Sequence, residues 1–435
     1  VSADTVRSYT PWESVLRLVS YMRPYKRLAF VSLAFSLTGS GLFVARPYLI
    51  KLAVDNHIAD GNLHGLGGVI LAFCGLVALK YLSDYCLNLF TGILGQKVMH
   101  DLRMHVFGHI LSMEMRFFDR NQVGRLMTRT TDDVNTLNDL YTTGAVSTIN
   151  NLAVIAGILI VMLWLDWRLA LATLTVTPLL ALLGYAFAAR IRALYRVIRK
   201  GTARLNAFLQ ESILGMRVIQ LTRHANWSRT KFIGLSDTLM DAKIENVLYY
   251  GLFFPLLELI GMLGIAIILV SGGHRIVDDT IRIGVLIAFM RLVDMFFWPI
   301  RELAENFNTL LSALAASERI FTLLDTKAKV VDPPVPLATT IERDIVFEHV
   351  WFAYNEGEWV LRDVSFRVAP GERVAFVGPS GSGKTTVISL LLRFYDVARG
   401  RILIGGRDIR EMSLDDVRRA FALLGQAPFL LKCTV

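Results

Sequence analysis

The sequence has little charge and few cysteines for its length. Only 19% of its 435 residues are charged, whereas 54% are hydrophobic, a balance that argues against an ordinary soluble protein. Its three cysteines give no even disulfide framework, and Cys74 and Cys86 would lie about 18 Å apart on one helix, too far for a disulfide bond. We therefore expect all three cysteines to be packing residues of a membrane protein.

Basic residues are in excess, but their positions do not fit a nucleic-acid-binding protein. The net charge is +9, and the basic residues gather in polar segments between apolar ones. One such group consists of Arg190, Arg192, Arg196, Arg199, Lys200 and Arg204. Because no nucleic-acid recognition module is visible, the pattern indicates retention of Lys and Arg on one side of a bilayer, and we expect no nucleic-acid partner.

Six apolar segments are long enough, at about 20 residues, to cross a hydrocarbon core about 30 Å thick. They lie at 28–50, 66–95, 142–165, 169–189, 247–271 and 283–305. The third and fourth are joined only by Asp166-Trp167-Arg168, which predicts an antiparallel helical hairpin. Ahead of them, Thr10-Pro11-Trp12-Glu13 has the residues of a capping box and predicts a helix within 1–27. That helix lies either in the membrane interface or in solution as a short amphipathic helix.

The distribution of charge predicts the orientation of the spans. The short loops carry few basic residues, whereas the long segments 96–141 and 190–246 carry many. The positive-inside rule then places both termini and both long segments in the cytoplasm, as parts of a multi-pass protein of the cytoplasmic membrane. Since the long segments are rich in helix formers, we expect each to be a helical hairpin that projects from the bilayer.

A change of composition predicts the division into domains. We expect a transmembrane domain at 28–320 and a linker at 321–344, stiffened by Asp332-Pro333-Pro334-Val335-Pro336. From Ile345 onward, alternating apolar residues and turn residues predict strands, one of them over 372–378. The predicted fold class is thus an α-helical membrane domain of six spans followed by an α/β domain at 345–435.

The segment GPSGSGKTT matches the phosphate-binding pattern G-x-x-x-x-G-K-[ST] and lies between a predicted strand and a predicted helix. Backbone amides of such a loop and of the following helix bind phosphate oxygens, while Lys384 would reach the β and γ phosphates and Thr385 would hold Mg²⁺. The expected cofactors are therefore ATP and Mg²⁺, and the alternative is a glycine-rich turn that binds nothing. The candidate residues are Gly378, Pro379, Ser380, Gly381, Ser382, Gly383, Lys384, Thr385 and Thr386.

The order of these elements resembles ABC exporters of the half-transporter kind, in the multidrug and lipid-flippase family. The sequences FFDRNQVGRLMTRTTDDV at 117–134 and ESILGMRVIQLT at 211–222 resemble the two intracellular hairpins of that family. The resemblance implies short transverse helices near 119–124 and 215–221, which would dock on nucleotide-binding domains and couple them to the spans.

Two further site residues follow from the resemblance. Tyr354 matches the aromatic residue that stacks on adenine in this family, although an ordinary cross-strand aromatic residue remains the alternative. Gln426 matches the glutamine that contacts Mg²⁺ and the attacking water, with Ala427 in place of the acidic residue that follows it in many relatives. The family's signature, its Mg²⁺-binding Asp and catalytic Glu, and its switch His have no counterpart up to Val435. We therefore expect an incomplete nucleotide-binding domain that does not hydrolyse ATP alone.

Several ionisable residues lie within the predicted spans, where charge is costly. Lys80 with Asp84, and Arg291 with Asp294, are spaced to neutralise each other on one helix face. Alternatively these charges line a substrate path, for which Glu258 is the best candidate because no charged partner lies within four residues of it.

Two hypotheses of function follow. In the first, the protein is an ATP-driven exporter of an amphipathic small molecule, drug or lipid, and it works in the lipid membrane as a dimer with a second half-transporter, identical or related. In the second, it is an ATP-gated channel or the regulatory half of a heterodimeric complex. A soluble P-loop kinase is excluded, because six apolar spans have no place in a soluble fold.

Overall fold

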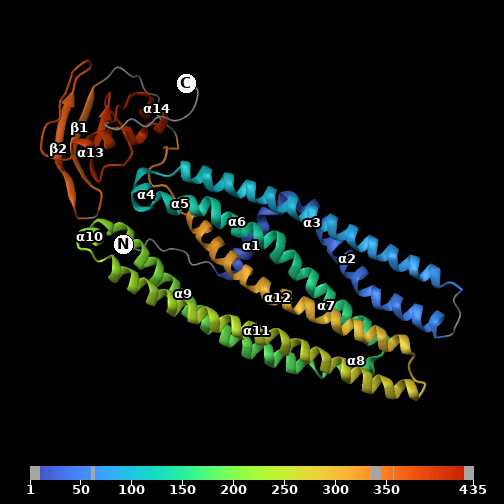
Figure 1. Ribbon diagram of the computed structural model, residues 1–435. Helices are drawn as coiled ribbons and strands as arrows, with labels where there is room; N and C mark the ends of the chain where they lie inside the picture. The colour runs from blue at the N-terminus through green and yellow to red at the C-terminus, as the bar shows by residue number, and fades with distance from the viewer. Residues whose placement is uncertain (1–9, 60–63, 335–343, 356, 426–435) are drawn as a thin grey trace. The chain divides into compact units, whose positions relative to one another are not determined.

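The computed structural model describes residues 10–59, 64–334, 344–355 and 357–425 (Figure 1). The chain divides into two compact units, one made of residues 25–94 and 141–310 and the other of residues 1–24, 95–140 and 311–435. The first unit is helical, and the second combines helical segments with a small sheet. The predicted fold class, a helical membrane part followed by an α/β region, is confirmed.

Long apolar helices form the first unit. In the described part of the chain, six helical stretches are long and apolar enough to cross a membrane. The helices that form them are α2 (Lys26–Ala53), α3 (Leu66–Leu111), α7 (Val146–Leu165), α8 (Trp167–Leu174), α9 (Thr177–Leu214), α11 (Ala225–Val277) and α12 (Ile283–Leu324). Three π-helical segments, Val54–Ile58, Arg129–Asp133 and Leu140–Ala145, adjoin them. The six predicted spans are confirmed, although several of the helices continue well beyond the apolar stretch.

A compact set of buried side chains joins these helices, while many of their other apolar side chains are exposed. The buried set includes Val44 on α2, Ile158 on α7, Ile268 on α11 and Phe289 on α12. Exposed side chains of Leu, Ile, Val, Phe, Tyr and Trp line the outer faces of the same helices. A protein that contacts lipid through its outer faces has this distribution, because lipid tails solvate apolar side chains.

The fourth predicted span is interrupted. It consists of α8 and α9, which are separated at Thr175–Val176. Pro178 lies in the first turn of α9. Amides of the first turn have no acceptor within the helix, so a proline costs no hydrogen bond there. The span predicted at 169–189 is confirmed within the candidate span Trp167–Leu214, but two helices form it rather than one.

A single residue connects α7 to α8. Asp166 has an extended backbone, and its Oδ1 accepts a hydrogen bond of 2.8 Å from the amide of Leu169 and thereby caps α8. The same carboxylate forms an ion pair of 2.6 Å with the guanidinium of Arg275 on α11. The sequence predicts a turn of three residues, but the observed turn is only Asp166, because Trp167 and Arg168 already belong to α8.

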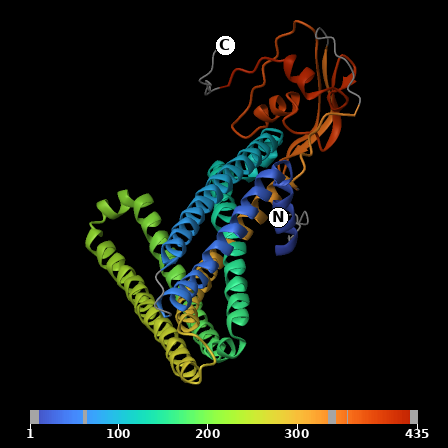
Figure 2. The same cartoon turned by 90° about the vertical axis from the view of Figure 1, so that its right-hand side faces the viewer.

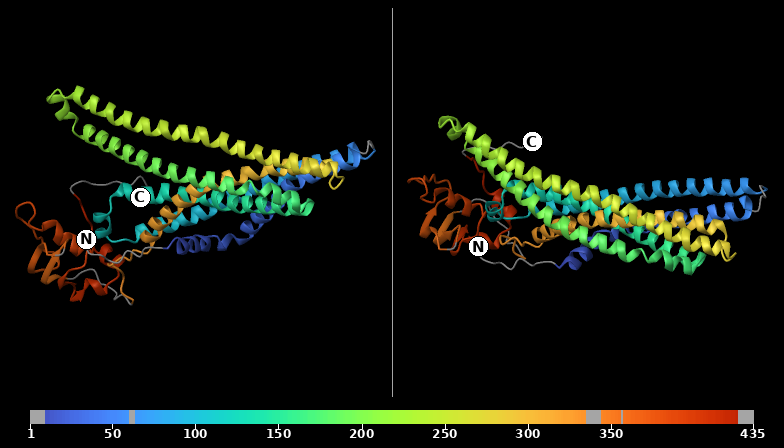
Figure 3. Two further views of the ribbon diagram at one scale, coloured as in Figure 1. Left: turned by 90° about the horizontal axis from the view of Figure 1, so that it is seen from below. Right: turned by 60° about the horizontal axis from the view of Figure 1, so that its bottom comes forward.

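The segment 190–246 is helical, as expected, and contains a short separate helix at its centre. Helices α9 and α11 lie side by side along their length, and α10 (Met216–Leu221) connects their ends (Figure 2; Figure 3). The short helix expected near 215–221 is thus confirmed.

The segment 96–141 is also helical, but its short helix does not lie where it was expected. Helix α4 (Met115–Arg120) ends at Asn121, where the backbone becomes extended, and the backbone and side-chain amides of Asn121 both donate to the Phe117 carbonyl, at 3.0 and 2.8 Å. Helix α5 (Val123–Thr128) and then α6 (Val134–Asp139) follow. The helix predicted near 119–124 therefore begins and ends about four residues earlier, at 115–120.

The N-terminal helix α1 (Pro11–Tyr21) has the predicted capping box. The Thr10 hydroxyl accepts from the Glu13 amide at 3.3 Å, and the Glu13 carboxylate accepts from the Thr10 amide at 3.0 Å. Leu18 is buried, whereas Trp12, Leu16 and Val19 are exposed. A short 3₁₀ turn, Arg23–Tyr25, follows the helix.

Four antiparallel strands form the sheet of the second unit, in the order β2-β1-β3-β4. They are β1 (Ile345–Ala353), β2 (Trp359–Val368), β3 (Arg399–Ile404) and β4 (Arg407–Asp408). Helix α13 (Lys384–Leu391), the 3₁₀ turn Ile409–Glu411 and helix α14 (Leu414–Arg419) complete the region. The core includes Phe347, Phe352 and Ile402 from strands and Leu390 from α13.

The strand predicted over 372–378 is not formed. This segment has no regular secondary structure, and the Val377 side chain in it is 92% exposed. A strand exists only where a neighbouring segment accepts and donates its backbone hydrogen bonds. Among the described residues, no strand pairs with this segment, so its apolar alternation is insufficient to make it one.

Replacing Asp166 tests the junction of α7 and α8. We expect Asp166→Ala to lower the free energy of unfolding by about 2 kcal/mol, because it removes both a helix cap and an ion pair. Asp166→Asn keeps a capping side chain and should lose only part of this stability. Thermal unfolding in detergent measures the effect, with the exposed Asp278→Ala as control. Equal midpoints for Asp166→Ala and Asp278→Ala would contradict the assignment.

Candidate functional site

The loop Gly378–Gly383 has the backbone geometry of a phosphate-binding loop. Gly381 and Gly383 both have φ of +86°, in the left-handed region that favours glycine. A Cβ atom at Gly383 would also lie 2.8 Å from Cδ2 of Leu361 on β2. The loop therefore packs against the sheet where a larger residue would not fit, and α13 begins directly after it at Lys384.

Lys384 lies over the loop. Its Nζ donates to the carbonyl oxygens of Gly378 and Pro379, at 2.8 Å each, and to the Ser382 hydroxyl at 3.3 Å. An ammonium held on carbonyl groups of the loop can transfer its hydrogen bonds to phosphate oxygens that enter the same loop. Pro379, Ser380 and Ser382 are exposed beside it.

The two threonines after Lys384 differ in exposure. Thr385 is exposed, so that its hydroxyl is accessible to a metal ion next to the loop. Thr386 is only 5% exposed, and its hydroxyl lies 3.2 Å from the hydroxyl of Tyr354. Thr386 could thus contact a phosphate through its backbone amide, which lies in the first turn of α13, but not through its side chain.

Tyr354 follows β1 directly and is half-buried beside α13. Its ring meets those of Phe352 and Tyr395 edge to face, with ring centres 4.9 and 5.2 Å apart. The structure therefore brings this candidate adenine-stacking residue to the helix that follows the loop. Gln426, the other residue taken from the resemblance, lies outside the described residues.

Tyr395 links this cluster to α4, and sequence reasoning missed it. Its side chain is only 8% exposed, and its hydroxyl donates to Oδ2 of Asp119 at 2.5 Å. Burial and the hydrogen bond to Asp119 raise the pKa of Tyr395, so the phenol stays protonated and remains a donor. Arg116 on the same helix donates to the Ala353 carbonyl at 3.3 Å. The contacts thus run from α4 through Tyr395 and Tyr354 to α13.

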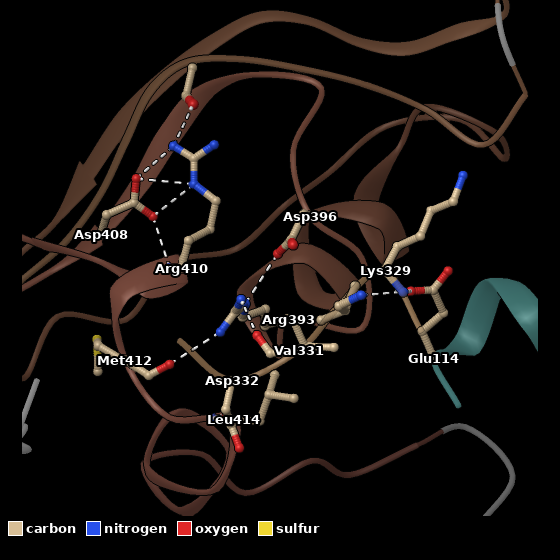
Figure 4. Close-up of polar contacts among 12 residues, drawn as sticks. Glu114, Lys329, Val331, Asp332, Arg393, Asp396, Asp408, Arg410, Met412 and Leu414 are labelled. Carbon is tan, nitrogen blue, oxygen red and sulfur yellow. Dashed lines mark hydrogen bonds and ion pairs between the residues drawn. The ribbon is translucent and has the colours of Figure 1, made fainter. Parts of the chain in front are cut away.

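The chain segment after α12 is held on two sides (Figure 4). The Glu114 carboxylate accepts hydrogen bonds of 2.7 Å from the amides of Lys329 and Val330. Asp332 accepts a bond of 2.6 Å from the amide of Leu414. The part of the expected linker at 329–332 is therefore fixed by side-chain contacts rather than by stiff prolines alone.

Arg393, a buried residue of the second unit, also binds the segment after α12. It is 3% exposed, pairs with Asp396 at 3.1 Å, and donates to the carbonyls of Met412 and Val331, also at 3.1 Å (Figure 4). A buried guanidinium is stable only when its donors have partners, and these acceptors supply them. Arg393 thus connects the linker to the chain just after α13.

Comparison with known proteins agrees with this arrangement of elements. The family model for the ABC transporter transmembrane region matches residues 29–300, and the model for the ABC transporter domain matches residues 361–434. An uncharacterized ABC transporter ATP-binding protein of Bacillus subtilis is 33% identical over 98% of this chain and 71% of its own length.

Two further relatives have names that state a substrate. The ATP-dependent lipid A-core flippase of Syntrophus aciditrophicus is 29% identical over 96% of this chain and 70% of its own length. The fatty acid ABC transporter ATP-binding/permease protein of Mycobacterium bovis is 29% identical over 99% of this chain and 74% of its own length.

A double-mutant cycle tests the contact between α4 and Tyr395. We expect Tyr395→Phe and Asp119→Asn each to destabilise the protein by about 1 kcal/mol, because each removes or weakens one hydrogen bond to a carboxylate. The double variant should be little worse than either single one, since both changes affect the same bond. Chemical unfolding measures the energies, with the exposed Asp132→Asn as control. Strict additivity of the two changes would contradict a direct interaction.

Proposed function

Because the chain belongs to the ABC transporter family, as an exporter half-transporter, we propose that the full-length protein uses ATP to export an amphipathic small molecule, drug or lipid across the cytoplasmic membrane. The observation that carries this proposal is the presence of six membrane-length apolar helices and a phosphate-binding loop in one polypeptide. The two relatives named for lipid A and for fatty acids act on amphipathic molecules, which supports the same class of substrate here.

In this proposal the loop residues Gly378 to Gly383 and the first amides of α13 bind the phosphates of ATP, and Lys384 binds the β and γ phosphates. Thr385 holds Mg²⁺ together with Gln426, and Tyr354 stacks on adenine. Bound Mg²⁺ would neutralise negative charge on the phosphates. The accessible hydroxyl of Thr385 and the position of Lys384 on the loop carbonyls support these roles.

The proposed coupling uses the contacts of α4. Asp119 binds Tyr395, which packs on Tyr354, and the Tyr354 hydroxyl contacts Thr386 of α13. A shift of the loop on ATP binding would move Thr386, and this chain of contacts would carry the displacement to α4 and the helices that continue from it. We further propose that both termini lie in the cytoplasm and that a second half-transporter, identical or related, completes the functional dimer.

We propose the same domain division that the sequence predicts, with an N-terminal helix at 1–27, a transmembrane domain at 28–320, a linker at 321–344 and a nucleotide-binding region from 345. The fixed contacts of residues 329–332 support a linker that transmits force rather than a loose tether.

Lys384→Ala in the full-length protein tests the proposed function. We expect ATP binding to weaken about 10- to 100-fold and ATP-driven uptake into inverted membrane vesicles to be lost, because a charge-assisted contact to phosphate disappears. Calorimetry with ATP and uptake of labelled lipid or drug measure the two effects. Arg373→Ala, an exposed basic residue before the loop, is the matched control and should retain both activities. ATP-driven uptake by Lys384→Ala equal to that of the wild type would contradict the proposal.

A further inference from the structure

A cavity of about 440 Å³ lies within the first unit, between α2, α3, α7 and α12. Its wall is far more polar than membrane-spanning helices usually allow, since it contains Ser40, Lys80, Asp84, Thr91, Asn150 and Glu302. All of these residues lie on helices that form candidate membrane spans. Polar groups at this depth are costly, so a wall of this kind indicates a site for a polar ligand group.

Some of these groups satisfy one another, and some do not. Lys80 forms an ion pair with Asp84 one helical turn away, and the Ser40 hydroxyl donates to the Asn150 side-chain carbonyl at 2.8 Å. By contrast, Thr91 is only 4% exposed, and its hydroxyl is buried with no hydrogen-bond partner among the described residues. A buried hydroxyl without a partner destabilises a protein unless another polar group reaches it. Thr91 is thus a second, independent indication of a ligand.

The charged residues of the cavity wall indicate the sign of the charge on the ligand. Lys80 and Asp84 neutralise each other, which leaves the negative charge of Glu302, for which no ion pair is found in the described part of the chain. Trp298 lies one turn before Glu302 on α12, is 45% exposed and lines the same cavity. A carboxylate next to an indole face favours a cation, because both attract positive charge. The Phe43 ring, by comparison, already has Lys80 and Arg46 within 5.6 and 5.2 Å of its centre.

We propose that this cavity binds the positively charged head of an amphipathic substrate, with Glu302 as the counter-ion and Trp298 as the aromatic face. The inference rests on the proposed function and specifies its substrate class as organic cations with an apolar body. Glu258, which the sequence favours for a substrate path, is exposed on α11 and is absent from the wall of this cavity.

Two probes of equal shape and opposite charge test the proposal. The purified protein in lipid nanodiscs is titrated with tetraphenylphosphonium and with tetraphenylborate, without ATP. We expect the cation to bind at least about tenfold more tightly than the anion after subtraction of binding to empty nanodiscs. Glu302→Gln should reduce cation affinity about tenfold and should not reduce anion affinity, because it removes an attraction for the cation and a repulsion of the anion. Glu258→Gln, which removes a carboxylate elsewhere in the spans, should bind the cation like the wild type.

A second pair of variants tests the site independently, in case Glu302→Gln does not fold. Trp298→Phe retains an aromatic face and should keep most of the affinity for the cation, whereas Trp298→Leu should lose it. Equal affinities for the two probes, or equal loss in Glu302→Gln and Glu258→Gln, would overturn the proposal.

Failure of this inference is distinguishable from failure of the proposed function. ATP-driven uptake of a lipid or drug without any dependence of cation binding on Glu302 would overturn the cation site and leave the exporter intact. Cation binding that depends on Glu302, in a protein with no ATP-driven uptake, would support the site and contradict the exporter.

Discussion

The absence of water in the core of a bilayer is the constraint on which the rest of this structure depends. Backbone amides and carbonyls there must bind one another within helices, and each polar side chain needs a partner nearby. At two places in the first unit, short and specific contacts meet the second requirement. Asp55, which is almost fully buried, accepts a hydrogen bond of 2.7 Å from the amide of Gly284 at the start of α12. Asp166 caps α8 and pairs with Arg275, so that one carboxylate stabilises a junction of a single residue. In the cavity between α2, α3, α7 and α12, an unpaired carboxylate and a buried hydroxyl without a partner among the described residues line the same space, and together they point to a ligand.

Under the proposed function, the second unit must meet a different requirement, which is to pass a displacement at the phosphate-binding loop on to α4. Gly381 and Gly383 give the loop its left-handed backbone positions, and Gly383 lets the loop pack closely on Leu361 of β2. Side-chain contacts connect this region to two other segments. Tyr354 and Tyr395 reach α4, and Arg393 reaches the segment after α12. Because Glu114 at the start of α4 also holds the amides of Lys329 and Val330, α4 and this segment are tied together. A displacement at the loop therefore has two connected routes, one through aromatic packing and one through hydrogen bonds.

The sequence predicts much of the fold because the signals for it are local. The six spans, the capping box of Thr10 and Glu13 and the setting of the loop before α13 depend on periodicity and on neighbouring residues, whereas the helix at 216–221 was expected from the resemblance to the exporter family. Features that depend on tertiary partners were missed. Among the described residues, the segment 372–378 alternates like a strand but has no strand to pair with, and α4 ends early because the backbone becomes extended at Asn121. Tyr395 and Glu302 were missed for the same reason, since only the fold places Asp119 beside the first and Trp298 and Thr91 around the cavity of the second.

The arrangement of the chain across the membrane is the central claim, and cysteine accessibility tests it most directly. A functional variant without Cys74, Cys86 and Cys433 would carry a single cysteine either at Trp167, beside the α7–α8 junction, or at Val218 on α10; both side chains are exposed. In intact cells, a membrane-impermeant maleimide should label the cysteine at 167 and not the one at 218, whereas permeabilised cells should show both labelled. Labelling of both positions in intact cells, or of 218 alone, would contradict six membrane crossings with the phosphate-binding loop in the cytoplasm.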